Sequence, residues 1–503
     1  MPQFGAQVSM ARRTGGYSHQ KAGKRQVEGR KYTAKERRTM KKMSLSLSAI
    51  LLSVGLALSG CSGSNAPGDS GSSSPKPSGT DSSAKPSASA SPSASAAPAK
   101  KPEDFKGEIT VWKGYEDVTN LFRKKYPNVK VITDTPPKSE DKFTTALATG
   151  TGAPDVIDLS QAHFHKFKAM AGLENLLDAP YNAGAMQKDF APMAWEMSTT
   201  LDGKKLFGLP WRMTPYVMFY RADIFEENGY PSDPDSVGQL IADPDKFFEL
   251  AQKMRAKGHY FFRKAEEVTD IASPGVGYYD KDLKYLRNND TFAKAIDYAK
   301  RATQLDLIFP GAKEEQDRAL NNGKLITYFG GVYRLSTFQI DENGGKGSLS
   351  ENQGKWRMTT LPFGQHPGLG YGTYVIPSQS KNKELAWEYI KFAVTSPEAQ
   401  QIFMKTADLT PYKPHWSLPI VKEKVEPAMG GQKILEEGFK MVDKMVYQSG
   451  NPLDEKASTI WGEKLTEALT KNQDSRAVLQ QIADETEKAV SVEKDALKKV
   501  LGK

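Results

Sequence analysis

The sequence contains one cysteine, Cys61, among 503 residues. Disulfides within the chain and cysteine-rich metal sites are therefore excluded, and the single thiol needs an explanation of its own. The chain also lacks an excess of positive charge after residue 60. Its formal net charge is +9, but residues 1–60 hold 12 Lys/Arg and 2 Asp/Glu, so residues 61–503 carry a net charge of −1. A nucleic-acid-binding protein would place its basic surface on the folded part, so nucleic acid is not an expected partner.

The apolar run ahead of Cys61 is too short to span a bilayer. It covers residues 45–58 and follows the basic pair Lys41 and Lys42, whereas a membrane-spanning helix needs roughly 20 apolar residues. A positively charged start followed by a short apolar stretch is typical of a secretory signal peptide. We therefore predict a signal peptide over residues 40–60.

The end of this segment, residues 58–61 (LSGC), resembles the lipobox of bacterial lipoproteins. The resemblance implies cleavage before Cys61 and attachment of diacylglycerol to its thiol. Two or three acyl chains hold a protein at a membrane where one chain does not. We expect a lipoprotein anchored through Cys61 at the extracellular face of the cell membrane; the alternative is a signal peptide with an accidental cysteine.

The segments on either side of the signal peptide have no pattern typical of a packed core. Residues 1–39 are basic and fit no leader, and we predict that they are a non-native or untranslated extension, since codons for Lys35 and Glu36 can read as a ribosome-binding sequence. Of the 40 residues from Cys61 to Lys100, 33 are Ser, Ala, Pro, Gly or Thr. Such a composition cannot bury enough apolar surface to fold. We therefore predict a disordered tether over 61–104.

The pattern changes from Phe105 onward, where apolar residues alternate between strand and helix periods. Strands are expected near 109–112, 129–132 and 156–159, with helices over 118–126 and around 143–147. This βαβαβ order predicts an α/β fold with a mostly parallel sheet. Further strands are expected at 325–329 and 374–376, a helix start at Ser396, and two carboxyl-terminal amphipathic helices containing residues 460–469 and 478–482.

Seven short motifs, in this order and spacing, make the body recognisable. They are residues 107–112 (GEITVW), 153–158 (APDVID), 202–210 (DGKKLFGLP), 219–225 (FYRADIF), 370–372 (GYG), 383–392 (KELAWEYIKF) and 396–400 (SPEAQ). Together they resemble the family 1 extracellular solute-binding proteins of ATP-binding-cassette (ABC) importers. The resemblance covers about residues 105–503.

The resemblance implies a periplasmic-binding-protein-like fold: two α/β lobes joined by a hinge, with a ligand cleft between them. Lobe one would take residues 105–211 plus 376–412, and lobe two residues 213–371 plus 420–503. The hinge would close over a small-molecule solute, most simply a carbohydrate, and the closed monomer would deliver it to the membrane permease. The chain has no phosphate-binding Gly-x-x-x-x-Gly-Lys motif, so it is not the ATPase, and no cofactor is expected.

A sugar site needs flat aromatic platforms together with polar groups. We chose nine candidates that follow expected strands, lie at the first crossover, or sit beside glycines: Trp112, Tyr115, Glu116, Ser160, His163, Trp211, Arg212, Tyr333 and Tyr371. Tyr333 and Tyr371 are expected on exposed, tightly turning backbone because of those glycines. The competing interpretation makes the tryptophans core residues, Arg212 a partner in a hinge salt bridge, and Glu116 a helix amino-terminal charge.

Other functions stay open. Where maltose-binding protein has an aromatic, an acid and an arginine, this chain has Leu159, Ala162 and His163, which argues against maltodextrin. His163 and His165 could supply two metal ligands, but no nearby cysteine or acidic cluster completes a set. A glycan-active enzyme is a weaker alternative, since the chain has neither a Gly-x-Ser-x-Gly nor a His-Glu-x-x-His motif. A sensory binding protein would use the same binding physics.

Overall fold

The structure is a computed structural model that describes residues 100–341, 343–446 and 450–503. Residues 1–99 lie outside it, so the predictions for the extension, the signal peptide, Cys61 and most of the tether concern residues that it does not describe. The last residues assigned to the tether, Pro102–Asp104, form a short 3-10 helix. Among the described residues, regular secondary structure therefore begins at Pro102, inside the range predicted as tether.

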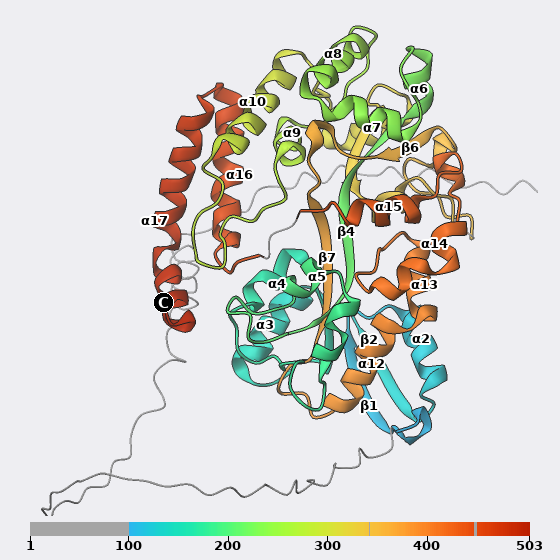
Figure 1. The fold of residues 1–503 in the computed structure, drawn as a ribbon, viewed down its shortest axis with the longest axis vertical. Coiled ribbons are helices and arrows are strands. Elements are labelled where there is room, and N and C mark those ends of the chain that lie inside the picture. Colours follow the sequence, from blue (N-terminus) through green and yellow to red (C-terminus); the bar gives the residue numbers. More distant parts are fainter. Residues whose placement is uncertain (1–99, 342, 447–449) are drawn as a thin grey trace, which may run out of the picture. The chain divides into compact units, whose positions relative to one another are not determined.

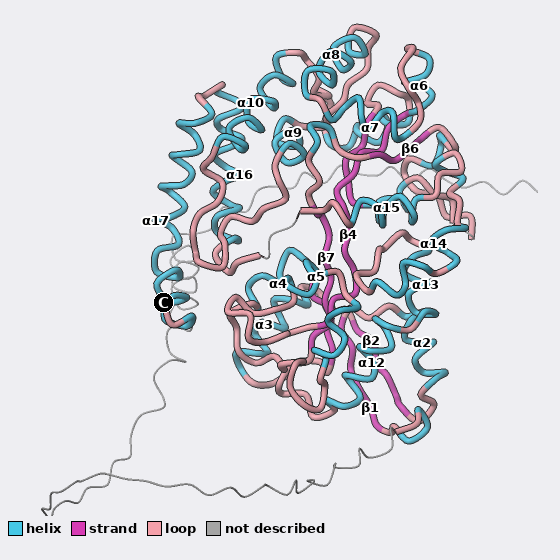
Figure 2. The backbone as a smooth tube through the Cα atoms, in the orientation of Figure 1, coloured by secondary structure: helices cyan, strands magenta, loops and turns pink. Residues whose placement is uncertain are grey.

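Seven strands carry the architecture (Figure 2). They are β1 (Gly107–Trp112), β2 (Val129–Asp134), β3 (Val156–Ser160), β4 (Leu209–Arg221), β5 (Thr327–Gly331), β6 (Trp356–Thr359) and β7 (Gly368–Val375). Their order is β2-β1-β3-β7-β4-β5, with β6 also paired to β4. The sequence predicted the first three strands correctly, and β1 pairs in parallel with both β2 and β3.

The expectation of a mostly parallel sheet is wrong beyond these three strands. The pairs β3–β7, β7–β4, β4–β5 and β4–β6 are all antiparallel. The cause is the long strand β4, whose first half pairs with β7 and whose second half pairs with β5 and β6. β4 and β7 thus run in opposite directions between two sheet regions, which Figure 1 shows as the long central pair.

The helices cover both sheet regions (Figure 1). They are α2 (Glu116–Lys125), α3 (Ser139–Thr149), α4 (Gln161–Phe167), α5 (Pro192–Met197), α6 (Ala222–Glu227), α7 (Pro234–Ala242), α8 (Pro244–Arg255), α9 (Ala265–Ala272), α10 (Asp290–Gln304), α11 (Lys313–Asn321), α12 (Lys383–Thr395), α13 (Pro397–Lys405), α14 (Pro419–Glu423), α15 (Ile434–Val442), α16 (Asp454–Lys471) and α17 (Ser475–Leu501). None of the described helices is both long and apolar enough to cross a membrane.

The fold is two-lobed. Lobe one is the region of β1, β2, β3 and the adjoining ends of β7 and β4. Helices α2–α5, α12 and α13 cover it. Lobe two is the region of β5, β6 and the far half of β4, and it is covered by α6–α11 and α15–α17. The predicted helix start at Ser396 is confirmed, since its Oγ accepts a hydrogen bond from the Ala399 N–H at 3.0 Å. Both predicted carboxyl-terminal helices are also present as α16 and α17.

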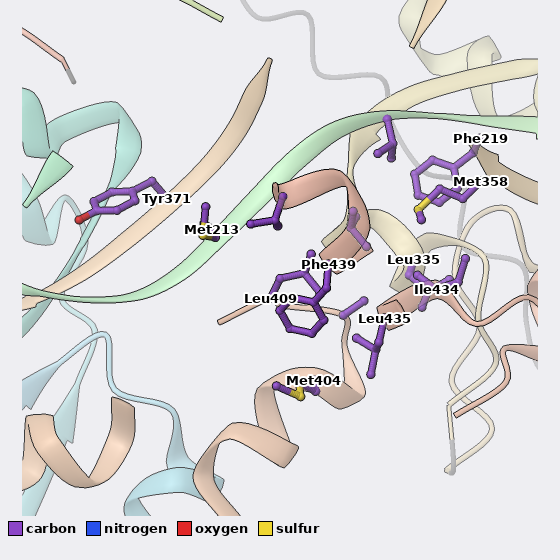
Figure 3. Close-up of a cluster of buried hydrophobic side chains, with 14 of the residues drawn as sticks. Met213, Phe219, Leu335, Met358, Tyr371, Met404, Leu409, Ile434, Leu435 and Phe439 are labelled. Atoms are coloured by element: carbon purple, nitrogen blue, oxygen red, sulfur yellow. The ribbon is translucent and has the colours of Figure 1, made fainter. Parts of the chain in front are cut away.

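The main hydrophobic core is continuous along β4. Figure 3 shows Met213 of β4 near Tyr371 of β7, and farther along β4 it shows Phe219 beside Met358 of β6. The predicted strand at 325–329 is shifted, because β5 begins at Thr327 and includes Gly330 and Gly331. These glycines were expected to form a turn, and that expectation is wrong: Val217 and Tyr216 pair with them across the sheet.

Candidate functional site

Three of the sequence candidates meet in a buried group where β3, β4 and β7 adjoin. We call Tyr115, Asp158, Trp211, Arg212 and Asp408 the hinge cluster. The Trp211 indole N–H donates to Asp158 Oδ1 at 2.8 Å, and an Arg212 nitrogen lies 3.3 Å from Asp408 Oδ1. The Tyr115 ring packs edge-on against Trp211, and the Arg212 guanidinium lies over the same indole. Arg212 therefore forms a salt bridge, as its competing interpretation expected; that this bridge lies at a hinge stays a prediction.

The hinge cluster is electrostatically self-contained. Burial raises the pKa of the Asp158 carboxyl, and the positive charges of Arg212 and Lys113 oppose that rise. Burial likewise raises the pKa of Asp408, against the neighbouring charge and hydrogen bond of Arg212. Two buried carboxyl groups therefore share the field of one guanidinium, which is itself 21 % exposed. Trp211 is only 1 % exposed, so its side chain is engaged inside lobe one.

The remaining candidates after the first and third strands are spread over the surface of lobe one. Trp112 is partly buried and lines a shallow hollow of about 640 Å³ on the α3 side. Glu116 begins α2 and is exposed, paired with Arg123 and hydrogen-bonded to Thr133. Ser160 hydrogen-bonds to Glu140, which also pairs with Lys113 at 2.9 Å. His163 lies in α4, but its side chain is not among those described.

The two tyrosines beside glycines differ from expectation. Tyr371 is 1 % exposed, and its hydroxyl meets the Ala194 carbonyl at 3.2 Å and Ser198 Oγ. The expectation that it lies on exposed, turning backbone is wrong, because residue 371 sits inside β7 and its ring packs on Phe164. Tyr333 is half-buried in the 3-10 helix Val332–Thr337, with its ring against Gly331.

A cavity of about 480 Å³ lies between the lobes, and none of the nine candidates lines it. Lobe one contributes Phe164 and His165 from α4, while β4 contributes Tyr216 and the start of β7 contributes Gly368 and Leu369. Lobe two contributes the rest of the wall. Its members are Asp270, Ser273, Pro274, Gly275, Val276, Gly277, Tyr278, Arg287, Gly450, Asp454 and Ser458, and Pro367 completes the lining ahead of β7.

Tyr278 and Arg287 form a braced aromatic surface in this wall. The Arg287 guanidinium lies 3.6 Å from the centre of the Tyr278 ring. It donates to the carbonyls of Val276 at 2.9 Å and Gly277 at 3.3 Å. Because these bonds fix the guanidinium against one face of the ring, Tyr278 is held in place while it lines the cavity. The pair therefore offers a rigid flat platform to a ligand.

Two carboxyl groups face the same cavity. Asp454 begins α16 and accepts the backbone N–H groups of Asn451 at 3.0 Å and Tyr279 at 3.3 Å. Burial raises its pKa to about 6, although those backbone donors and Arg287 favour the charged form. Asp270 lies in α9 and lines the cavity with a side chain that is still exposed; desolvation by the protein around it raises its pKa to about 6, against the charges of Lys264 and Arg287. The cavity thus combines aromatic surface with strong hydrogen-bond acceptors.

Sequence reasoning missed this cavity because its walls come from segments far apart in the chain. One signal was present: residues 273–278 (SPGVGY) join turn-forming residues to an aromatic. His163 and His165, the suggested metal pair, fall in one short helix, where positions two apart do not share a face. Among the described residues no group of three or more His, Cys, Asp or Glu side chains converges as a metal site would require.

The sequence is similar to those of several known binding proteins. It is 26 % identical over 344 residues to the arabinooligosaccharide-binding protein of Bacillus subtilis, covering 63 % of this chain and 76 % of that protein. It is 23 % identical to the galactooligosaccharide-binding protein of the same organism, covering 61 % and 73 %.

Solved structures share the fold. A crystal structure of a family 1 extracellular solute-binding protein superposes with a TM-score of 0.65 at 22 % identity, covering 76 % of this chain and 99 % of that one. The sugar-binding protein MalE of Xanthomonas citri gives a TM-score of 0.63 at 19 % identity, covering 78 % and 99 %. The sequence pattern described as bacterial extracellular solute-binding protein matches residues 118–426. The chain therefore belongs to the bacterial extracellular solute-binding protein family, as its motifs predicted.

Proposed function

We propose that this protein is the solute-binding component of an ABC importer and that it captures an oligosaccharide in the cavity between its lobes. The observation that carries the proposal is the cavity wall, which the braced Tyr278 ring lines together with the carboxyls of Asp270 and Asp454. A sugar presents C–H groups on its faces and hydroxyls at its rim. The ring accepts the face, and the carboxylates accept hydrogen bonds from the hydroxyls.

Hinge closure supplies the capture step. The cavity takes Phe164 and His165 from lobe one and a wall of loop and helix residues from lobe two, while β4 and β7 cross between them. A rotation about these two strands would open or close the cavity without disturbing either sheet region. We propose lobe boundaries at residues 105–211 plus 376–412 and 213–371 plus 420–503, with solute release to a membrane permease from the opened form.

We further propose that the mature protein is a lipoprotein. Residues 40–60 would be removed, Cys61 would carry the acyl chains, and the Ser/Ala/Pro-rich segment would tether the body outside the membrane. The support is the coincidence of the apolar segment, the lipobox-like residues 58–61 and the only cysteine of the chain. Labelling cells with a palmitate analogue checks this directly: label should enter the wild-type protein and be absent from Cys61→Ser.

The solute is identified by thermal unfolding of the mature chain in the presence of candidate ligands. A ligand that binds only the folded state stabilises it, by about 2.7 kcal/mol at a hundred times its Kd. Arabino- and galacto-oligosaccharides form the first panel, because two relatives are named for them, and maltodextrins and divalent metals complete it. A raised melting temperature with an intact glycan is expected. Hydrolysis of the glycan, or a shift with metal alone that chelation abolishes, would overturn the proposal.

A further inference from the structure

A second contact joins the lobes beside the cavity, and it is apolar. Leu201 and Ala169 of lobe one join Tyr279, Leu283, Leu453 and Leu497 of lobe two in one cluster, with Leu501 at its edge. Leu201 and Leu497 are each 8 % exposed. We call these residues the latch cluster. Neither Leu201 nor Leu497 lines the cavity.

Interactions within lobe two hold the lobe-two residues of the latch cluster in place. Lys503 at the chain end pairs with Asp282 at 2.5 Å, and the Asn451 side-chain amide donates to the Asp280 carbonyl at 3.0 Å. The first bond holds the loop between α9 and α10 against the end of α17, and the second holds it against the segment before α16. Leu283 adopts a left-handed φ of 61° within that loop. Figure 1 shows α17 alongside α16, with its carboxyl end reaching past α10.

The lobe-one side is a single short hairpin. Thr199 bridges to Leu206, and Leu201 sits between them with its N–H donating to the Lys168 carbonyl at 3.1 Å. The Lys168 ammonium is buried and donates to the carbonyls of Glu196 and Met197. Two carboxylates act on that ammonium, Glu196 from lobe one and Asp454 from lobe two. Both charges oppose the fall in the Lys168 pKa that its burial causes.

From this arrangement we infer that the end of α17 is a latch that holds the two lobes closed, with Leu201 as the contact that must be broken for opening. A contact present in one conformation and absent from the other shifts the equilibrium by its own free energy. The latch therefore sets how often the empty protein is closed, and through that its apparent affinity. Helices α16 and α17 lie outside residues 118–426 that the family pattern matches.

The test measures the distance between the lobes without solute. In the full chain carrying Cys61→Ser, dyes on Asp178→Cys in lobe one and Lys257→Cys in lobe two report opening by single-molecule energy transfer; both positions are exposed. Truncating a buried leucine removes apolar contact equivalent to about a tenfold change in an equilibrium constant. Leu201→Ala should therefore raise the ratio of open to closed molecules about tenfold, and Leu497→Ala should do the same from the opposite lobe.

The matched control is Val492→Ala, since Val492 lies on the same helix and is 69 % exposed. It should leave the distance distribution unchanged. If Leu201→Ala gives the same interlobe distance distribution as the wild type and this control, the latch does not exist. The same conclusion follows if the wild-type protein without solute is always open. Should Leu497→Ala fail to fold, Leu201→Ala, on a short hairpin, still decides. The latch rests on the proposed hinge closure, but this measurement contains no solute, so its failure leaves the solute-binding test untouched.

Discussion

The indole N–H of Trp211 donates to Asp158 Oδ1 at 2.8 Å in the space left by Gly372. A β-carbon at residue 372 would lie 2.7 Å from the indole nitrogen and 3.3 Å from the carboxylate oxygen. The glycine of β7 therefore makes room for a hydrogen bond between β3 and β4. This bond joins β4, which crosses between the lobes, to the parallel part of the sheet in lobe one. A hinge needs a rigid attachment at this point.

Replacing Trp211 by Phe should destabilise the protein by about 1–3 kcal/mol, because the buried Asp158 carboxylate loses its neutral donor and no water replaces it. Chemical denaturation at pH 7 measures the change. Trp387→Phe is the control, since Trp387 is buried in the same lobe-one core but lies on α12. Equal losses from the two substitutions would show that only ring size matters. Solute affinity tested on Trp211→Phe also decides whether Trp211 has the binding role first predicted.

The buried Lys168 should make stability depend on pH above neutrality. Burial lowers its pKa from 10.5 to about 7, despite the charges of Glu196 and Asp454. Between pH 7 and 10.5 the unfolded chain therefore binds more protons than the folded one, so this residue makes the protein more stable as pH rises. The contribution between pH 7 and 9 is about 2 kcal/mol.

Denaturation of wild type and Lys168→Met at pH 7 and pH 9 isolates this contribution. The variant should lose the increase, while Lys257→Met, an exposed lysine of lobe two, should keep it. A wild-type slope that survives in Lys168→Met would contradict the assignment of the titration to Lys168.

The Tyr278 ring should carry much of the solute affinity. Tyr278→Ala removes the platform and should weaken glycan binding by about tenfold or more, since aromatic contacts of this kind contribute about 0.5–1.5 kcal/mol beyond their buried area. Tyr278→Phe keeps the ring against Arg287 and should bind nearly as well as wild type. Calorimetric titration with the glycan that stabilises the protein gives the constants. Tyr298→Ala, in the same lobe but stacked on Phe363 away from the cavity, should leave affinity unchanged.

The sequence predicted local structure better than it predicted the site. Strands β1, β2 and β3 and the cap at Ser396 follow from patterns within a few residues, and these predictions are confirmed. The antiparallel pairing of β4 with β7 joins segments about 160 residues apart, which no local pattern encodes. Trp211 was predicted at the first crossover and Tyr371 between two glycines, yet they lie within β4 and β7 and both side chains turn into the core. The cavity wall needed tertiary structure, because Asp270, Tyr278 and Asp454 meet only through the packing of α9 against α10 and α16.

Solute affinity should fall as the pH drops through about 6. Asp270 and Asp454 both have pKa values raised to about 6 by the protein around them. Sugar hydroxyls donate to the ionised carboxylates, so protonation competes with binding, and each group can weaken binding by up to about tenfold per pH unit below its pKa. Calorimetric titrations between pH 5 and 8 check this.

The empty protein should respond in the opposite direction. Both raised pKa values mean that the folded state binds more protons than the unfolded state between about pH 4 and 6, so these two groups make the protein more stable as pH falls through that window. Lost affinity at pH 5 therefore cannot be attributed to unfolding caused by them. Asp454→Asn and Asp270→Asn should each bind more weakly at pH 7.5 and show a flatter pH profile, whereas Asp178→Asn, exposed on lobe one, should match wild type. An unchanged profile in both cavity variants would remove the carboxylates from the binding site and leave the Tyr278 platform as its only supported part.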